Sequence, residues 1–515
     1  MLRALSCIVV SSLSAVHGAS TITLQLNDQV CVVGGGAAGV HYASLLAKKG
    51  LTNIQLLEAG DQVGGKSHTL YDDAGNPQEM GTVFALDTYT PIFDLVNQYD
   101  PSNARFEFAF EQQNYMACMG ESVGARDADS VTTMDFPQYL LRSVQVNAAL
   151  PPNATDDQLR ALMRQQTTQY IALHRRLFGI YPYGMPPQPK EWSEIDMTAL
   201  EFLTRHNLTA LVGMFRFFQQ QQGYGILETI PAFYFLWWSH PTTVQKVMGA
   251  QLLHQPCAYE FMRGFQSIWL AIANAHRRSI NTLVRTRVTS VTRGDGAFIK
   301  PTVAYETAWG ETGTLTCDHV VMAVDLSLYA SLVTDLTPDE QALFVGTYTS
   351  STFATTLYES EPSPVETATQ IWLTRMHENG RVSSLRNAKL SMPLPSARSR
   401  VEMSTGRQVR VAYQYYSTPL AQVNRAETTR VLKADLTVAG MPDPLIWKQM
   451  FFNYFPRFTA DGLKAGLPWK IWDIQGDRRT TWIGSSVCFE SALDVVTYNN
   501  NLIQRIQVVV ANITT

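Results

Sequence analysis

The stretch Gln29-Val-Cys-Val-Val33 runs directly into Gly34-Gly-Gly-Ala-Ala-Gly39, and this junction decides the fold. Its first part is uncharged and rich in β-branched residues, which is typical of a central parallel strand covered on both faces. Residues 40–49 follow with a helical pattern that stops at Gly50, and a second apolar strand over 54–57 ends in Glu58. This order of strand, glycine turn, helix, strand and acid predicts an α/β unit of the Rossmann type that binds a dinucleotide.

Each residue of this unit has a predicted physical duty. Gly34 allows the tight turn, Gly36 lets the backbone approach a pyrophosphate, and Gly39 permits close packing of the helix on the sheet. Ala38 stands in the same first turn, whose free N–H groups attract an anion. Glu58 would accept hydrogen bonds from the ribose hydroxyls.

The residues after Glu58 separate FAD from other dinucleotides. Glu58, five residues, Gly64-Gly65-Lys66, two residues and Thr69 together resemble the FAD-binding region of the flavin amine oxidase superfamily. The segment Glu79-Met-Gly81-Thr82 is similar to the part of that family whose backbone passes beside the isoalloxazine. The resemblance implies that FAD is the cofactor and that Gly65, Lys66, Gly81 and Thr82 contact it. Lys66 stands where most amine oxidases have arginine, so the charge is kept but the forked geometry is lost.

Further segments resemble the later FAD-binding parts of the same superfamily. They are Gly264–Trp269 with a helix to about residue 275, a strand-like run over 281–291, a buried strand over 317–324, and Thr481-Trp-Ile-Gly484-Ser485-Ser486. In the family, Val288 would hold the adenine through its backbone. The last segment is followed by a helix whose N-terminus points at the N1/O2 edge of the flavin. Gly484 and Ser485 replace the usual Gly-Glu pair of that motif.

The fold class implied by this resemblance is α/β, with a discontinuous Rossmann-type FAD-binding domain and an inserted α+β substrate domain, as in amine oxidases. We assign residues 27–99, 250–330 and 466–515 to the FAD-binding domain. Residues 100–249 are predicted to form a mainly helical substrate segment, and residues 331–465 a sheet-bearing substrate segment.

The chemistry is predicted from a finer resemblance and from one absence. The N-terminal signal, the GGKSHT variant and Phe489-Glu490-Ser look most like the fungal β-cyclopiazonate dehydrogenase family, whose members are FAD-dependent oxidoreductases of secondary metabolism that in some cases close rings oxidatively. Amine oxidases commonly hold a lysine-bound water at the flavin, but residues 350–357 contain no lysine. We therefore expect hydride removal from an activated C–H of a largely apolar small molecule, with O2 as electron acceptor.

Three alternatives stay open from the sequence. They are a redox-neutral FAD-containing isomerase of the polyenoic fatty acid type, an amine or amino-acid oxidase, and a non-catalytic FAD-binding protein. No catalytic acid or base can be nominated, although His68 or Cys488 could anchor the flavin covalently. The aromatic runs 215–222 and 233–238 are either plain core or the wall of an apolar substrate cavity.

Composition excludes other classes of function. The chain has 515 residues, of which 45% are hydrophobic and 16% charged, as expected of a globular enzyme. Its formal net charge of −4 gives no basic surface for a nucleic-acid partner. No Cys-x-x-Cys pair suggests a metal site.

The N-terminus predicts entry into the secretory pathway. Arg3, an apolar run over 4–16 and small residues at 16–19 are typical of a signal peptide, assigned to residues 1–18. The run is too short to cross a bilayer, so no membrane span is expected. Five cysteines remain after cleavage, so at least one thiol stays unpaired. The sequons at Asn153, Asn207 and Asn512 then become candidate glycan acceptors of a protein that is secreted or held in the lumen of the ER or a vesicle.

Overall fold

The computed structural model describes residues 21–108, 116–119 and 131–510, apart from residues 254, 256, 295, 297–298, 365, 373–377 and 394–404. Its first layer is a five-stranded sheet in the order β11-β3-β2-β15-β21, in which every neighbouring pair is parallel. The strands are β2 (Val30–Val33), β3 (Ile54–Leu57), β11 (Ile280–Leu283), β15 (His319–Met322) and β21 (Thr480–Trp482). The central strands β2 and β15 are buried along their whole length, as their uncharged sequences predict.

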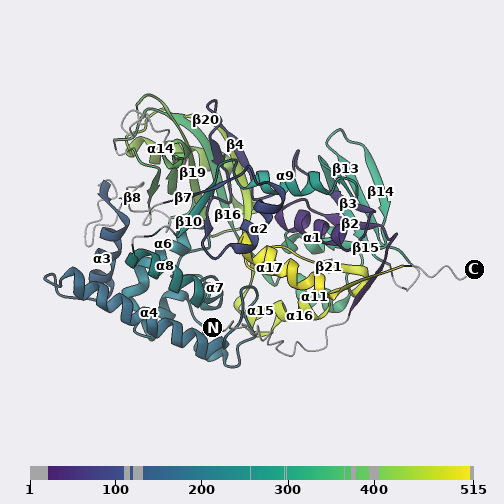
Figure 1. Ribbon diagram of the computed structural model, residues 1–515, viewed down its shortest axis with the longest axis horizontal. Helices are drawn as coiled ribbons and strands as arrows, with labels where there is room; N and C mark the ends of the chain where they lie inside the picture. Colours follow the sequence, from purple (N-terminus) through teal and green to yellow (C-terminus); the bar gives the residue numbers. More distant parts are fainter. Residues whose placement is uncertain are drawn as a thin grey trace, which may run out of the picture.

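Helices from distant parts of the chain pack together beside this sheet. α1 (Ala37–Lys48) contacts α17 (Ala492–Leu502) and α9 (Gln266–Ala275), and α2 (Thr90–Tyr99) contacts both of these partners. Near the two ends of the described chain, β1 (Ile22–Gln25) pairs in parallel with β22 (Ile506–Val509). The sheet and its helices form the right-hand part of the molecule in Figure 1. These elements confirm the predicted Rossmann-type, amine oxidase-like α/β architecture.

The run over 281–291, predicted as one strand, is two strands in two different sheets. β11 ends at Leu283, and β12 (Thr286–Thr292) begins a separate antiparallel sheet with β13 (Thr302–Thr307) and β14 (Thr312–Thr316). Between them Arg285 has a positive φ of 53°, which breaks the extended conformation. The alternation of side chains continues across such a single-residue break. The sequence therefore predicted one strand where the structure has two.

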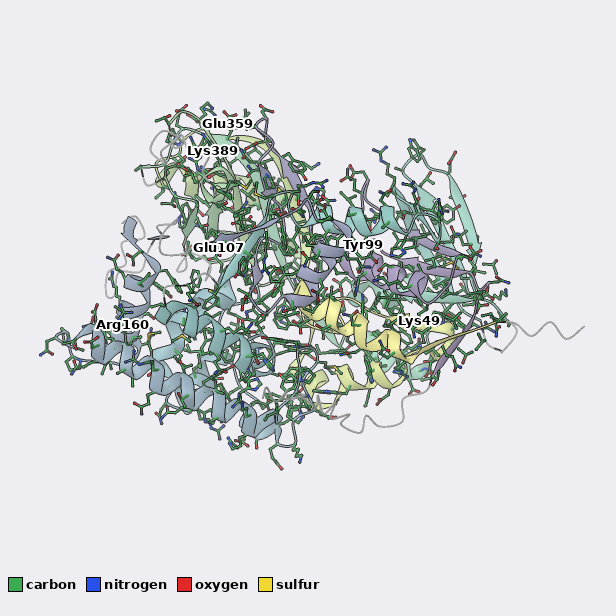
Figure 2. All side chains as sticks on the ribbon, viewed as in Figure 1. Lys49, Tyr99, Glu107, Arg160, Glu359 and Lys389 are labelled. Carbon is green, nitrogen blue, oxygen red and sulfur yellow. A yellow bond between two sulfur atoms is a disulfide. The ribbon has the colours of Figure 1, made fainter. Side chains whose placement is uncertain are left out.

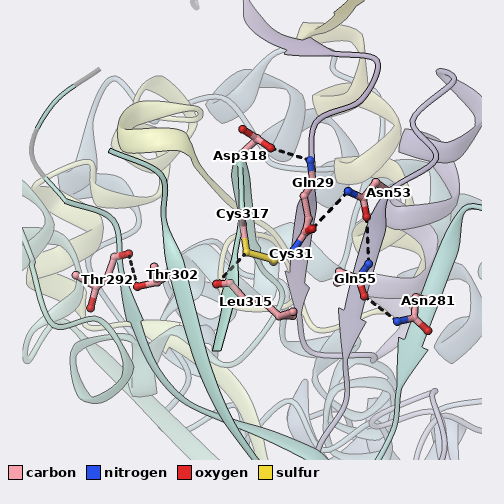
Figure 3. Close-up of a disulfide and its surroundings, with 10 residues drawn as sticks. All are labelled: Gln29, Cys31, Asn53, Gln55, Asn281, Thr292, Thr302, Leu315, Cys317 and Asp318. Atoms are coloured by element: carbon pink, nitrogen blue, oxygen red, sulfur yellow. Dashed lines mark hydrogen bonds between the residues drawn. A yellow bond between two sulfur atoms is a disulfide. The ribbon is translucent and has the colours of Figure 1, made fainter. Parts of the chain in front are cut away.

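A disulfide joins the two central strands of the parallel sheet. Cys31 in β2 is bonded to Cys317, which precedes β15, across 286 positions of the sequence. Figure 3 shows the bond next to the contact in which the Gln29 backbone N–H donates to Asp318 Oδ2 at 2.9 Å. Asp318 thus acts as a polar lead-in to β15 and fixes the register of the two strands at the same point.

The second layer is a seven-stranded sheet in the order β20-β16-β19-β18-β17-β8-β9. Its strands are β16 (Tyr348–Ser360), β17 (Thr369–Ile371), β18 (Val382–Arg386), β19 (Gln408–Tyr416) and β20 (Leu445–Phe458), with β8 (Met116–Met119) and β9 (Val131–Met134) at one edge. This sheet lies at the upper left in Figure 1. The same part of the chain contains the helices α11 (Pro338–Phe344), α14 (Arg425–Val438), α15 (Ala460–Lys464) and α16 (Leu467–Asp473). In Figure 1, α14 lies beside the sheet, whereas α11, α15 and α16 lie lower in the view, near α17.

The segment 100–249 contains strands as well as the predicted helices. Its helices are α3 (Phe136–Asn147), α4 (Asp156–Phe178), α5 (Ala199–Arg205), α6 (Val212–Gln221) and α7 (Ala232–Trp238), and α8 (Pro241–Leu253) continues beyond it. β7 (Arg105–Phe108) pairs with β10 (Ala258–Phe261), which also pairs with β6 (Ala85–Leu86). β8 and β9 join the second-layer sheet instead. The helical prediction missed these short strands because their partners lie far away in the sequence.

The helical segment has an aromatic core, whereas charged side chains such as Glu107 on β7 and Lys49 after α1 are exposed. Figure 2 labels both residues among the side chains of the molecule. All seven residues of α7 are buried, and Phe215 and Phe235 pack at 4.9 Å between ring centroids. Within the described residues, no helix is both long and apolar enough to cross a membrane, and no group of His, Cys, Asp and Glu could hold a metal ion.

Candidate functional site

A cavity of about 470 Å³ lies where the glycine loop, β12, the α17 N-terminus and the second-layer sheet meet. Its volume falls in the range of small-molecule and cofactor sites. Every predicted cofactor residue except Gly39 lines it. These residues are Gly34, Gly36, Ala38, Glu58, Gly65, Lys66, Gly81, Thr82, Val288, Gly484 and Ser485.

The three glycines of the first loop serve different purposes. A methyl group on Gly39 would lie 2.0 Å from the Gly34 carbonyl oxygen, so close packing of the chain requires this glycine. Gly34 has a positive φ of 104°, which a tight turn requires. A methyl group on Gly36 would meet nothing closer than the Gly65 Cα, at 3.8 Å. The fold therefore does not need a glycine at position 36, whereas a ligand that must approach the backbone does.

The N-terminus of α1 at this loop suits an anion. Its N-cap is Gly36, which has no side chain to accept a hydrogen bond from the first turn, and no acidic residue stands in that turn. The unsatisfied N–H groups and the helix dipole both favour a negative group. A pyrophosphate between Gly36 and Gly65 would satisfy them.

Glu58 and Val288 line the cavity on the side of β3 and β12. Glu58 follows β3, and its two carboxylate oxygens accept from the backbone N–H groups of Gly35, at 2.8 Å, and Gly60, at 2.6 Å. Its own carbonyl accepts from Thr286 N at 2.8 Å, which brings β12 and therefore Val288 to the same place. The carboxylate is thus held where a ribose would lie, beside the strand predicted to meet the adenine.

Gly81 and Thr82 lie against the second glycine pair. Thr82 N donates to the Lys66 carbonyl at 3.1 Å, and Met80 N donates to the His68 carbonyl at 2.8 Å. A methyl group on Gly81 would lie 1.8 Å from the Lys66 carbonyl oxygen. Only glycine allows the two segments to come this close, which forms the cavity wall where the family's flavin ring passes.

Lys66 forms an ion pair inside the cavity that the sequence did not predict. Its Nζ lies 2.8 Å from Glu490 Oε1, and the Glu490 side chain is only 4% exposed. Glu490 Oε2 also accepts from Phe455 N at 2.9 Å, and Ser485 Oγ lies 3.5 Å from Lys66 Nζ. Burial raises the pKa of Glu490, and the Lys66 charge opposes that rise. The lysine that replaces the family's arginine therefore neutralises a buried carboxylate beside Ser485.

Replacing Lys66 by methionine is expected to destabilise the cofactor-free protein by about 3 kcal/mol at neutral pH, because Glu490 is then buried without its cation. Without Lys66 the pKa of Glu490 rises further, so the native state binds a proton that the unfolded state releases. The loss should therefore be greatest at neutral pH and disappear as the pH falls below the ordinary carboxyl pKa. Urea unfolding across this pH range measures it. Lys66→Arg keeps the charge and should retain most of the stability, and an equal loss in both variants would contradict the ion-pair explanation.

The last motif places the N-terminus of α17 at the cavity. Gly484 has a positive φ of 98°, and the chain then reaches the N-cap Ser491, whose side chain accepts from Asp494 N. Ala492 in the first turn lines the cavity. A helix N-terminus at this point stabilises negative charge on a bound group, as the resemblance implies for the flavin N1/O2 edge.

The two candidate covalent anchors lie apart from the cavity. Neither His68 nor Cys488 is among the residues that line it. The Cys488 thiol is buried and donates to the Gly484 carbonyl at 3.2 Å. His68 contributes its backbone carbonyl to the pairing with Met80, and burial lowers the pKa of its ring.

The wall away from the Rossmann sheet is largely aromatic and is built from the second-layer sheet and the helical segment. Phe84, Tyr224, Phe353, Tyr413 and Tyr454 line it. Tyr224 and Tyr454 are stacked with their centroids 6.1 Å apart, and the Tyr454 hydroxyl donates to the Gln222 carbonyl at 2.9 Å. Among the described residues that line the cavity, the one lysine is Lys66.

A small apolar side cavity of about 20 Å³ lies beside this wall. Phe217, Phe218 and Trp238 line it, whereas Phe215 and Phe233 are plain core. Each aromatic run thus lies partly in the core and partly at this side cavity, because different faces of a helix point in different directions.

Comparison with known proteins agrees with this geometry. Residues 37–385 match the family described as flavin containing amine oxidoreductase. A polyenoic fatty acid isomerase of Ptilota filicina is 22% identical, with 94% of this chain and 96% of that protein aligned. An FAD-dependent oxidoreductase of Apiospora sacchari is 28% identical over 40% of this chain and 38% of its own length.

Solved structures show the same fold. A fatty acid isomerase from P. acnes superposes with a TM-score of 0.65 at 18% identity, covering 94% of this chain and 99% of the other. The glycine loop, the helix N-terminus, the space above Gly36 and the carboxylate of Glu58 all fit the dinucleotide that this family binds. The chain belongs to the flavin-containing amine oxidoreductase family, and its cofactor is FAD.

Proposed function

We propose that this protein uses FAD to remove a hydride from an activated C–H bond of a largely apolar small molecule. The observation that carries the proposal is the aromatic wall opposite the glycine loop, with its apolar side cavity. Such a wall binds a substrate by burial of apolar surface.

Bound FAD would supply the two-electron acceptor for this reaction. The protein's own residues would hold the substrate carbon against the cofactor and keep water out. Phe353 and Tyr454 have ring centroids 5.1 Å apart and form a rigid apolar surface for this purpose. After the C–H bond breaks, the carbon is left as a cation, which then loses a proton, is captured by a nucleophile of the same substrate, or regains the hydride at another position.

The lysine composition of the cavity supports this chemistry over amine oxidation. Lys66 is paired with Glu490, and residues 350–357 provide no other lysine on β16. An ammonium side chain free to hold a water at the flavin, as amine oxidases commonly have, is thus missing from the described lining.

Net oxidation and isomerisation share the first step of this scheme. Oxidation is supported by the resemblance to the fungal β-cyclopiazonate dehydrogenase family, which also favours a place in secondary metabolism, with O2 accepting both electrons and two protons to give hydrogen peroxide. Isomerisation is supported by the nearly full-length similarity to the Ptilota filicina protein. In that case the same hydride returns to another carbon and no acceptor is consumed.

Anaerobic mixing of the FAD-loaded protein with a polyunsaturated fatty acid is expected to perturb the flavin absorbance, and the time course distinguishes the two outcomes. Lasting bleaching means net oxidation, whereas product formation with full recovery of the absorbance means isomerisation. Saturated fatty acid of the same length is the matched control, because it lacks an activated C–H. If panels of unsaturated apolar compounds neither bleach the flavin nor change, the protein is a non-catalytic FAD-binding protein and the proposal fails.

We also propose that the protein works in the secretory pathway. The buried disulfide between Cys31 and Cys317 supports this location, because such bonds persist in oxidising compartments. Asn153 and Asn207 are exposed, as glycan acceptors must be. The predicted signal peptide and Asn512 lie outside the described residues.

A further inference from the structure

The main cavity and the aromatic side cavity share part of their lining, and we call the shared part the neck. Four residues line both spaces, namely Phe84, Gln221, Gln222 and Thr369. Thr369 lies on β17, and the glutamines lie at the C-terminal end of α6. A substrate that extends from the main cavity into the side cavity must therefore pass between β17 and α6.

The neck contains polar atoms that lack a partner. Thr369 is only 6% exposed, and its Oγ1 is buried without a hydrogen bond to any described residue. The Gln221 Oε1 is likewise buried without a hydrogen bond to any described residue. Buried polar groups without partners are costly and uncommon, so each needs an explanation. Because both residues line the cavities, a ligand group bound there is the partner that would satisfy these atoms.

Arg386 lies opposite Thr369, and its ion pair with Glu260 leaves no net charge beside the neck. The two residues are opposite one another in the antiparallel pair of β17 and β18, which puts their side chains on one face of the sheet. Arg386 lines the main cavity and is 2% exposed, and its guanidinium forms an ion pair with the equally buried Glu260. Its Nε has no partner among the described residues.

This charge balance selects against an anionic ligand group. Arg386 is already matched by Glu260, and burial raises the pKa of the neighbouring Glu79 to about 7, so Glu79 carries part of a negative charge at neutral pH. A ligand carboxylate would add an unmatched buried charge, which costs far more than a hydroxyl or carbonyl group. A neutral group can both donate to Gln221 Oε1 or Thr369 Oγ1 and accept from the Thr369 hydroxyl.

The side cavity limits the size of the ligand beyond its polar group. At about 20 Å³ it has room for about one methyl group, and the residues around it are almost entirely apolar. They are Phe84, Leu86, Phe108, Phe217, Phe218, Trp238, Ala258 and Ile371 with the neck residues. The side cavity therefore suits the short apolar end of a molecule.

We infer that the neck is a specificity site that binds an uncharged hydroxyl or carbonyl group of the substrate, placed next to a methyl end that enters the side cavity. The inference rests on the proposed function only in taking the substrate to be an apolar small molecule. Thr369 and Gln221 are the residues that select the neutral polar group, and a carboxylate is excluded at this position.

Calorimetric titration of the FAD-loaded protein with three probes that share an eight-carbon chain tests the inference without turnover. The probes are octan-2-ol, its isostere 2-methyloctane, in which a methyl group replaces the hydroxyl, and octanoate. The alcohol is expected to bind about tenfold tighter than the other two, as one or two neutral hydrogen bonds to otherwise unpartnered groups provide. Thr369→Val should remove that preference and leave 2-methyloctane binding unchanged. Gln221→Leu should act in the same direction.

Thr355→Val is the matched control. Thr355 on β16 is also fully buried with an unpartnered Oγ1, but it lines neither cavity. Both threonine variants should keep or raise the unfolding temperature, and only Thr369→Val should change binding. Equal binding of alcohol and alkane by the wild type, tighter binding of octanoate, or no effect of Thr369→Val and Gln221→Leu on the alcohol would each overturn the inference. Loss of catalytic activity with any substrate would bear on the proposed function and leave these binding results standing.

Discussion

A Gly36→Ala variant is expected to fold normally and to lose its FAD. Gly36 has a φ of −67°, which any residue adopts, and the added methyl group would stay 3.8 Å from the nearest protein atom. That methyl group would occupy the space through which the pyrophosphate approaches the N-terminus of α1. We expect FAD affinity to fall about 100-fold, which is the effect of roughly 3 kcal/mol of steric conflict. Flavin absorbance of the purified protein and titration of the cofactor-free form with FAD measure it.

Gly39→Ala is the contrasting control three residues away. Here the new methyl group would lie 2.0 Å from the Gly34 carbonyl, inside the protein, so the cofactor-free form itself should be destabilised. The pair separates a glycine kept for a ligand from a glycine kept for packing. If Gly36→Ala retains FAD with its usual affinity, the pyrophosphate does not lie where we place it.

Removal of the disulfide by Cys31→Ala with Cys317→Ala is expected to lower the free energy of unfolding by roughly 2–5 kcal/mol. The bond closes a loop of 286 positions, and a long loop loses much conformational entropy in the unfolded chain. It also ties β2, which leads to Gly34, to β15, which leads to Ala323. A methyl group on Gly34 would lie 2.9 Å from the Ala323 carbonyl, so the two loops meet at the FAD site. Urea unfolding with and without reductant measures the effect.

The reductant supplies the internal check of this prediction. Wild-type stability should fall to the level of the double variant when dithiothreitol is present during unfolding, and the variant should not respond. Cys488→Ala removes a buried thiol that is not in a disulfide, so it should keep the wild-type response to reductant. Wild-type unfolding that is insensitive to reductant would show that the bond does not form, and would remove the main support for a secretory location.

Much of the cofactor site could be predicted from the sequence because its features are local. The run from Gln29 to Gly39 contains a strand, a turn and a helix start within eleven residues, and each depends on its own side chains or on the lack of them. Gly34, Gly36 and Gly39 are recognisable because glycine alone suits a left-handed turn, a ligand contact or a close packing position. Val288 could be found only through resemblance to the family, since a valine in a strand has no local mark of function.

Other parts were missed because their causes lie far apart in the chain. The sequence around Leu283 and Thr286 predicts one continuous strand. The structure has two strands there because each pairs with a different sheet. The strands β7, β8 and β9 depend in the same way on partners distant in the sequence. Phe215 and Phe217 are the same residue type in one aromatic run, yet Phe215 lies in the core and Phe217 lines the side cavity. Which of them faces the cavity depends on the orientation of the helix, and that orientation is set by packing.

By itself, the sequence determined the cofactor and the kind of fold, because a glycine turn between a buried strand and a helix can be read within one short segment. Only the tertiary structure decided how the site is charged and shaped. It paired Lys66 with Glu490, which is 424 positions away, joined Cys31 to Cys317, and brought Thr369, Gln221 and Arg386 to the lining of one cavity. Periodicity reports the conformation of neighbouring residues, whereas ion pairs, disulfides and cavities depend on which distant surfaces the packing of the core brings together.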